Sequence, residues 1–150
     1  MRWLLERSAE QKVNIKTTEA PHYRRVAIQQ EAGQVRNVGH GVRSGFGIRD
    51  GSGIMFISHL GEVFPAGFLP LKAGNIRSAN VVDIYRDSQI FTDLRDSSKL
   101  KGKCGRCEFS HVCGGSRARA FSHTGDMLES DPLCLYEPKQ VGHGHLAMAG

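Results

Sequence analysis

The chain has 150 residues, a formal net charge of +5 at pH 7 and a hydrophobic content of 39%, with 18 glycines and four cysteines. This length fits one domain or two small ones, and the aromatic content of only 7% favours a loop-rich fold stapled by a metal. The basic residues are scattered without interleaved aromatic residues, which indicates a solvated surface rather than a nucleic-acid interface. No apolar stretch approaches membrane-spanning length and no signal peptide is visible, so we expect a cytoplasmic chain with reduced cysteines.

The first 32 residues predict a helix, a strand and a second helix. Residues 1–12 carry a small apolar face, residues 13–18 alternate β-branched and polar residues as a strand does, and residues 24–31 predict a short helix. Glu19 and His22 follow the strand, and the carboxyl end of a strand is where α/β sheets and barrels place their sites. These two residues are therefore candidates for substrate binding. The alternative is that both are ordinary residues of a surface loop.

The middle of the chain predicts a glycine-rich linker followed by a small sheet and helices. Residues 33–52 hold many glycines and show no apolar periodicity, so we interpret them as a linker. The glycines do not have the spacing of a phosphate-binding fingerprint. Residues 54–58 and 62–64 form two apolar runs around Gly61, as in a β-hairpin, and residues 74–75 indicate another turn. Asn80 can cap a helix that is broken near Ser88. The predicted inward face of that helix consists of Val81, Ile84, Tyr85, Phe91 and Leu94.

The four cysteines lie within 31 positions in the pattern C-x2-C-x5-C-x20-C, at Cys104, Cys107, Cys113 and Cys134. A C-x2-C pair places two sulfurs on one tight turn, and four thiolates suit either zinc or an iron–sulfur cluster. A thiol oxidoreductase would need a thioredoxin-like frame, which the flanking sequence does not supply. Ser116 predicts the cap of a helix over residues 117–123 that Gly125 ends, and residues 139–150 predict a disordered tail.

Several of these segments together resemble a known family. The hairpin ending Gly61-Glu62-Val63-Phe64-Pro65, the Gly74-Asn75-Ile76 turn, the Val82-Asp83-Ile84-Tyr85 helix and the C-x2-C-x5-C-Gly-Gly block are similar to the SPASM or twitch domain. That module extends radical S-adenosylmethionine (SAM) enzymes, here most like those related to haem and haem d1 biosynthesis. Residues 17–23 also resemble the last barrel strand and exit loop of these enzymes. The resemblance implies one fully cysteine-ligated [4Fe–4S] cluster, held by the four cysteines.

The sequence departs from the family pattern in two ways. Ala66 and Arg117 stand where SPASM domains with two auxiliary clusters have cysteines, so the first cluster is not expected. The C-x3-C-x2-C motif that binds SAM in this family is also missing from the chain. The resemblance therefore implies part of a radical SAM enzyme that lacks the SAM-binding barrel core and should not be active alone.

The expected organisation is α+β, with the last strand and helix of a partial (β/α)6 barrel before a small SPASM-like domain. Residues 1–32 would be the barrel remnant, residues 33–52 the linker, residues 53–138 the auxiliary iron–sulfur domain and residues 139–150 the tail. The cluster would serve electron transfer and support of the substrate chamber, with SAM bound only in the complete enzyme. Expected partners are the barrel, in the same full-length chain or a separate subunit, and a ferredoxin or flavodoxin; nucleic acid and membrane are not expected. The alternative is a structural four-cysteine zinc module.

Overall fold

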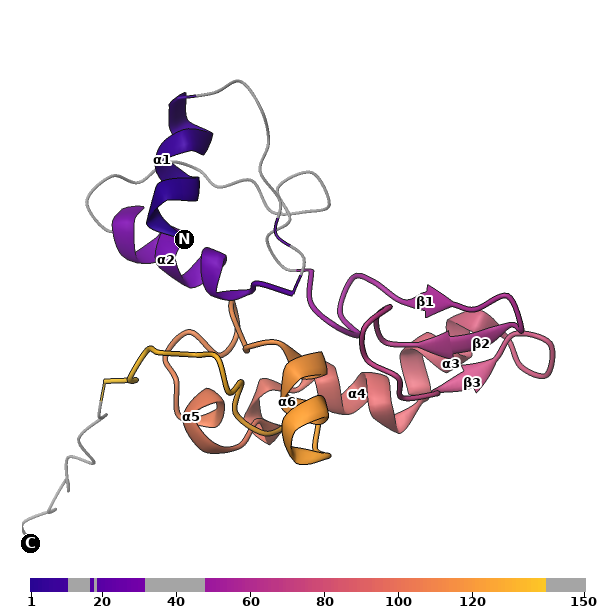
Figure 1. Cartoon of the computed structure of the whole chain (residues 1–150). Helices are drawn as coiled ribbons and strands as arrows, with labels where there is room; N and C mark the ends of the chain where they lie inside the picture. The colour runs from indigo at the N-terminus through magenta and orange to yellow at the C-terminus, as the bar shows by residue number, and fades with distance from the viewer. Residues whose placement is uncertain (11–16, 18, 32–47, 140–150) are drawn as a thin grey trace, which may run out of the picture.

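The computed structural model describes residues 1–10, 17, 19–31 and 48–139, and shows two N-terminal helices beside a mixed part that carries the sheet and the cysteines (Figure 1). Helix α1 spans Arg2–Glu10 and helix α2 spans His22–Glu31. All of the predicted strand at 13–18 except residue 17, most of the predicted linker and nearly all of the predicted tail lie outside the described residues. The last barrel strand therefore stays a prediction, whereas the combination of helices with a small sheet confirms the α+β class.

The sheet has three short antiparallel strands in the order β1 (Phe56–Ile57), β2 (Glu62–Phe64) and β3 (Gly74–Asn75). Gly61 makes the predicted turn between β1 and β2 with a φ of 81°, which glycine adopts without strain. The segment at 74–75, expected as a turn, instead pairs with β2 as a third strand, and the turn follows it. Its glycine allows close packing, because a Cβ on Gly74 would lie 2.9 Å from Ile84 Cδ1.

Short helices follow the sheet, and their ends lie where capping residues are found. They are α3 (Val81–Asp87), α4 (Gln89–Arg95), the 3-10 helix η1 (Ser97–Lys99), α5 (Gly102–Gly105) and α6 (Arg117–Thr124). The Asn80 side chain accepts a hydrogen bond of 2.8 Å from Val82 N, and Ser88 takes an extended conformation that separates α3 from α4. Ser116 caps α6 and left-handed Gly125 ends it, so these four predictions are confirmed.

Two adjacent apolar clusters form the core. Val63, Ile84 and Phe91 join the sheet to α3 and α4. The second cluster joins α4 to α6, whose ribbons run close together in Figure 1, and it consists of Ala66, Leu69, Leu94 and Ala118. The described end of the predicted linker packs here too, since Gly51 N donates to Pro65 O and a Cβ on Gly51 would lie 2.9 Å from Leu94 Cδ1.

The edge strand β1 leaves an apolar face uncovered in the described part of the chain. Phe56, Ile57, Leu60 and Phe68 expose 47%, 39%, 54% and 64% of their surface. A cluster of this kind on a small domain usually marks a contact surface. Within residues 1–10, 17, 19–31 and 48–139, no helix combines the length and hydrophobicity needed to cross a membrane.

Candidate metal centre

A single helical turn and its exit present the first two cysteines. Cys104 lies in α5 and is 7% exposed, while Cys107 follows the end of the helix and is half-buried. Gly105 between them is required by close packing rather than by its backbone angle, because a Cβ there would lie 2.1 Å from Leu100 O. The glycine in the C-x2-C turn therefore lets α5 approach the preceding loop.

Backbone turns bring the third and fourth cysteines to the same place. The amide of Cys113 donates to Phe109 O at 2.8 Å, and the amide of Cys134 donates to Asp131 O at 3.1 Å. Gly114 and Gly115 then adopt φ values of 62° and 69°, which turn the chain from Cys113 into α6. A Cβ on Gly115 would lie 3.0 Å from Cys104 Sγ, so the glycine pair also leaves room for the sulfur.

All four cysteines line one pocket with an empty volume of about 330 Å³. Its other lining residues are Arg25, Lys103, Ser110, Gly114, Gly115, Tyr136 and Pro138. The lining in the described part of the chain thus combines thiols and cations and contains no carboxylate. Such a pocket suits a group that is negatively charged and bound through sulfur.

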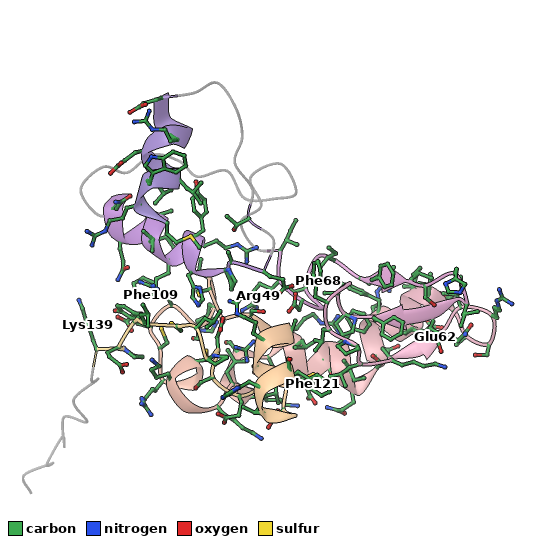
Figure 2. The ribbon with its side chains drawn as sticks, viewed as in Figure 1. Arg49, Glu62, Phe68, Phe109, Phe121 and Lys139 are labelled. Carbon is green, nitrogen blue, oxygen red and sulfur yellow. The ribbon has the colours of Figure 1, made fainter. Side chains whose placement is uncertain are left out.

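Helix α2 covers this pocket although it belongs to the N-terminal part of the chain. Arg25 lies on the ring of Tyr136, with its Cζ atom 4.4 Å from the ring centroid, and both residues line the pocket. Arg49 donates to Ser110 O at 3.1 Å from the other side of the cysteine loop, and Figure 2 shows it between the α1–α2 part and α6. Cations from outside the cysteine segment therefore contribute to its surroundings.

The environment raises the pKa of two of the thiols. Burial raises the pKa of Cys113 to about 11, although a hydrogen bond from the Gly115 amide opposes the shift. Burial also raises the pKa of Cys107, against the effect of a hydrogen bond from the Phe109 amide. Both thiols are therefore protonated at neutral pH in the metal-free chain, and metal binding there releases protons.

Next to the cysteines, Asp131 organises a buried polar network, here called the Asp131 network. Asp131 is 1% exposed. Its carboxylate accepts a hydrogen bond of 2.7 Å from the Ser116 amide, and two from Arg119, at 2.7 Å from Nη2 and 3.0 Å from Nε. His22 Nε2 lies 3.2 Å from the same carboxylate but off the line of a hydrogen bond. Burial favours the protonated acid, yet the contacts from His22, Arg119 and the backbone amides outweigh it and hold the pKa of Asp131 well below its usual range.

The two residues predicted as substrate ligands both point into this network. The Glu19 carboxylate accepts from Ser116 Oγ, and its carbonyl accepts from Arg119 Nη1, with a positive φ of 53° at Glu19. The His22 side chain is only 12% exposed against Asp131. The structure thus brings Glu19 to Ser116 and Arg119, 97 and 100 positions away in the sequence, and His22 to Asp131.

Asp50 was not singled out in the sequence and joins this cluster at the start of α6. Burial and the neighbouring Glu19 carboxylate raise the pKa of Asp50 to about 6, against hydrogen bonds from the amides of Arg117 and Ala118. Nothing in the local sequence marks Asp50, which stands in the glycine-rich segment. Its significance depends on the return of the chain to α6.

Other residues near the cysteines differ in whether they line the pocket. Lys103, Gly114 and Gly115 line the pocket, and Lys103 Nζ donates to Cys134 O at 2.7 Å. Arg106, between the first two cysteines, is exposed and does not line it. Ala66 is 6% exposed in the apolar core, and Arg117 is 4% exposed beside Cys104. The sequence marked Arg117 only as a position without a cysteine.

The close approach at Gly105 gives a first testable expectation. Replacing Gly105 by Ala should lower the free energy of unfolding by about 1–3 kcal/mol, because the added methyl group would collide with a backbone oxygen that has little room to move. Urea unfolding followed by circular dichroism measures the effect. Gly67→Ala is the matched control, since its Cβ would meet nothing closer than Phe56 at 4.0 Å. Equal stability of both variants would contradict the packing seen at Gly105.

The described side chains do not form a preassembled site for a single metal ion. Among the described residues, no three His, Cys, Asp or Glu side chains are placed to hold one metal ion together. Four sulfurs at 2.3 Å around one tetrahedral zinc would lie about 3.8 Å from one another. The cysteines therefore share a pocket without converging on a single point.

Comparison with known proteins finds relatives over nearly the whole chain, although no family model matches it. It is 44% identical over 142 residues to the AdoMet-dependent heme synthase of Methanosarcina barkeri, covering 92% of this chain and 41% of that protein. It is 37% identical over 145 residues to the AdoMet-dependent heme synthase of Nitratidesulfovibrio vulgaris, and this match covers 94% of the chain and 40% of that protein. The pre-heme d1 synthase of Dinoroseobacter shibae is 29% identical over 115 residues, covering 74% and 28%.

The chain spans about two fifths of the length of the two heme synthases. The match extends beyond the cysteine segment, because it includes more than nine tenths of the 150 residues. The relatives include heme-forming and heme d1-forming enzymes, as the resemblance of the motifs indicated. The chain therefore belongs to the radical SAM/SPASM family, in which it corresponds to part of these longer enzymes.

Proposed function

We propose that Cys104, Cys107, Cys113 and Cys134 bind one auxiliary [4Fe–4S] cluster in a radical SAM enzyme. The observation that carries this proposal is that the four cysteines of the chain all line one pocket. Four thiolates are the usual ligand set of such a cluster. Residues 53–138 would form the auxiliary domain, and residues 1–32 the end of the barrel that precedes it.

The surroundings of the cysteines fit a cluster. Arg25 and Lys103 supply positive charge at the pocket wall, where four thiolates would otherwise repel one another. Tyr136 also lines the pocket and holds the Arg25 side chain of α2 on its ring. The Gly115 amide, which contacts Cys113, can donate to a thiolate sulfur and favour its charged form.

Four cysteine ligands leave no position for a substrate, so the proposed roles are electron transfer and structural support. A bound cluster supplies one-electron redox chemistry. The protein controls its potential through burial, nearby charge and hydrogen bonds to sulfur. Glu19 and His22 remain candidates for the substrate side of the chamber. Their observed contacts with Ser116, Arg119 and Asp131 would link that side to the cysteine segment.

The complete enzyme would have a SAM-binding barrel, in the same longer polypeptide or in a partner subunit. The chain has no C-x3-C-x2-C motif, so SAM cleavage would depend on that barrel. The relatives that cover most of the chain are named AdoMet-dependent heme synthase and pre-heme d1 synthase, and a tetrapyrrole is accordingly the proposed substrate class. The apolar face at Phe56, Ile57, Leu60 and Phe68 suits a protein contact. We place the enzyme in the cytoplasm, with a ferredoxin or flavodoxin as reductant.

Analysis of iron and acid-labile sulfide, on chain made and reconstituted without oxygen, tests the proposal. About four irons and four sulfides per chain are expected for one cluster. One zinc and no sulfide would overturn it and make the chain a structural zinc module.

A further inference from the structure

The guanidinium of Arg117 is buried next to the cysteine pocket and is tied to the backbone. The residue is 4% exposed. Its Nη1 atom donates to Met127 O at 2.9 Å and to Glu129 O at 2.7 Å, and Nε donates to Gly115 O at 3.4 Å. These carbonyls belong to the turn before Cys134 and to the glycine pair after Cys113. Together they fix the guanidinium in one orientation.

The remaining nitrogen of the Arg117 guanidinium, Nη2, points at a cysteine sulfur. Arg117 Nη2 lies 3.5 Å from Cys104 Sγ, and the contact is buried. The Asp131 amide approaches the same sulfur at 3.5 Å from a second direction. Cys104 thus has two donors aimed at its sulfur, and hydrogen bonds to a ligand sulfur tune the group bound through it.

Arg117 makes no direct ion pair with a carboxylate in the described part of the chain, although its charge interacts with that of Asp50 at longer range. In the described part of the chain, none of the ion pairs within 4.0 Å includes Arg117. Arginine does not lose its proton in proteins, and a buried unpaired charge is strongly unfavourable. Backbone carbonyls accept from Nη1 and Nε without forming an ion pair, so the fold leaves a buried cation beside Cys104 that favours an anion there.

We infer that Arg117 is a positioning residue that supplies the counter-charge to Cys104 and to the group bound there, and so raises the reduction potential of that group. The inference rests on the proposed function. One-electron reduction, with the electron supplied by an external reductant, adds one negative charge to a cluster. A fixed cation at 3.5 Å from a ligand sulfur stabilises the reduced form more than the oxidised form.

The test compares Arg117→Gln with Arg106→Gln in the reconstituted 150-residue chain. Both variants remove one positive charge near the cysteines, but Arg106 is exposed whereas Arg117 is buried against sulfur. Redox titration followed by electron paramagnetic resonance should show reduction of the Arg117→Gln cluster disfavoured at least tenfold, a shift of about 59 mV to more negative potential. Arg106→Gln should change the equilibrium less than threefold, because water screens its charge. Equal shifts at matched iron content would overturn the inference.

Arg117→Lys keeps the test decisive if Arg117→Gln gives no folded protein. Lysine retains the charge but cannot donate to the carbonyls and the sulfur together. The equilibrium constant for reduction of the cluster should change less than threefold in Arg117→Lys, because the charge is kept. The Fe–S(Cys) stretching frequencies in resonance Raman spectra should rise, because a hydrogen-bond donor to the sulfur is lost. Unchanged frequencies with a lowered potential would contradict the assignment.

The proposed function can fail separately from this inference. If the chain binds one zinc without sulfide, the cluster proposal falls, and the same pair of variants is compared for zinc affinity. Counter-charge at Cys104 then predicts that Arg117→Gln weakens zinc binding at least tenfold relative to Arg106→Gln. Equal affinities would overturn the role of Arg117 in that case as well.

Discussion

Chains in which any one of the four cysteines is replaced by Ala should lose most of their iron and sulfide and become less soluble. Metal binding and folding are coupled in small metal-stapled domains, so loss of one ligand removes both cluster and packing. The loss should be greatest at Cys104 and Cys113, which are 7% and 5% exposed, because a vacated buried ligand position cannot be filled by water as easily as a half-buried one. Iron and sulfide per chain, measured after anaerobic reconstitution, gives the result.

Ser110→Ala is the control for the cysteine variants. Ser110 lines the same pocket but is not among the proposed ligands, so its replacement should leave cluster content near that of the unaltered chain. Normal iron and sulfide in all four cysteine variants would exclude the proposed ligand set. Loss in Ser110→Ala as great as in Cys113→Ala would show instead that the pocket is sensitive to any change.

The second large effect is expected from Asp131→Asn, which should lower the free energy of unfolding at pH 7 by about 3–5 kcal/mol. The substitution leaves Arg119 and the Ser116 amide without their buried anionic partner. Because the folded-state pKa of Asp131 lies below its ordinary value of 3.8, its stabilisation is complete above pH 3.8 and is lost as the pH falls toward the folded-state value. The difference between the two proteins should therefore shrink in acid.

Urea unfolding at pH 7 and acid unfolding below pH 4, both followed by circular dichroism, measure these effects. Asp87→Asn is a suitable control, since Asp87 is exposed at the end of α3, and a change within about 0.5 kcal/mol is expected there. A loss in Asp131→Asn that is equally small, or that grows as the pH falls, would show that the Asp131 network contributes little to stability.

The elements that could be predicted from the sequence are those governed by neighbouring residues. Gly61 at the turn, Asn80 and Ser116 at helix starts and Ser88 between two helices are all local backbone preferences, and the structure shows each of them. The short strand at 74–75 was missed because its pairing is set by Val63 on β2 rather than by any strand propensity of glycine and asparagine.

The candidate site could be predicted only in part. The spacing of the cysteines indicated a shared site, and the structure places all four around one pocket. The role of Asp131 could not be predicted, because its partners His22 and Arg119 come from distant parts of the chain. Arg106 lies between two cysteines in the sequence but is exposed, whereas Arg117 reaches a cysteine sulfur from α6, 13 positions further along the chain.

The contacts of Glu19 with α6 also have a consequence for the order of assembly. They join residues 97 and 100 positions apart, whereas the four cysteines span 31 positions. Closing the longer loop costs about 1 kcal/mol more in chain entropy, so the cysteine segment can form before Glu19 and α2 dock on it. During synthesis, Glu19 and α2 are made before Ser116 and Asp131, so the contacts between them can form only after the cysteine segment has been made. The part of this chain that is made first is therefore expected to reach its final position last.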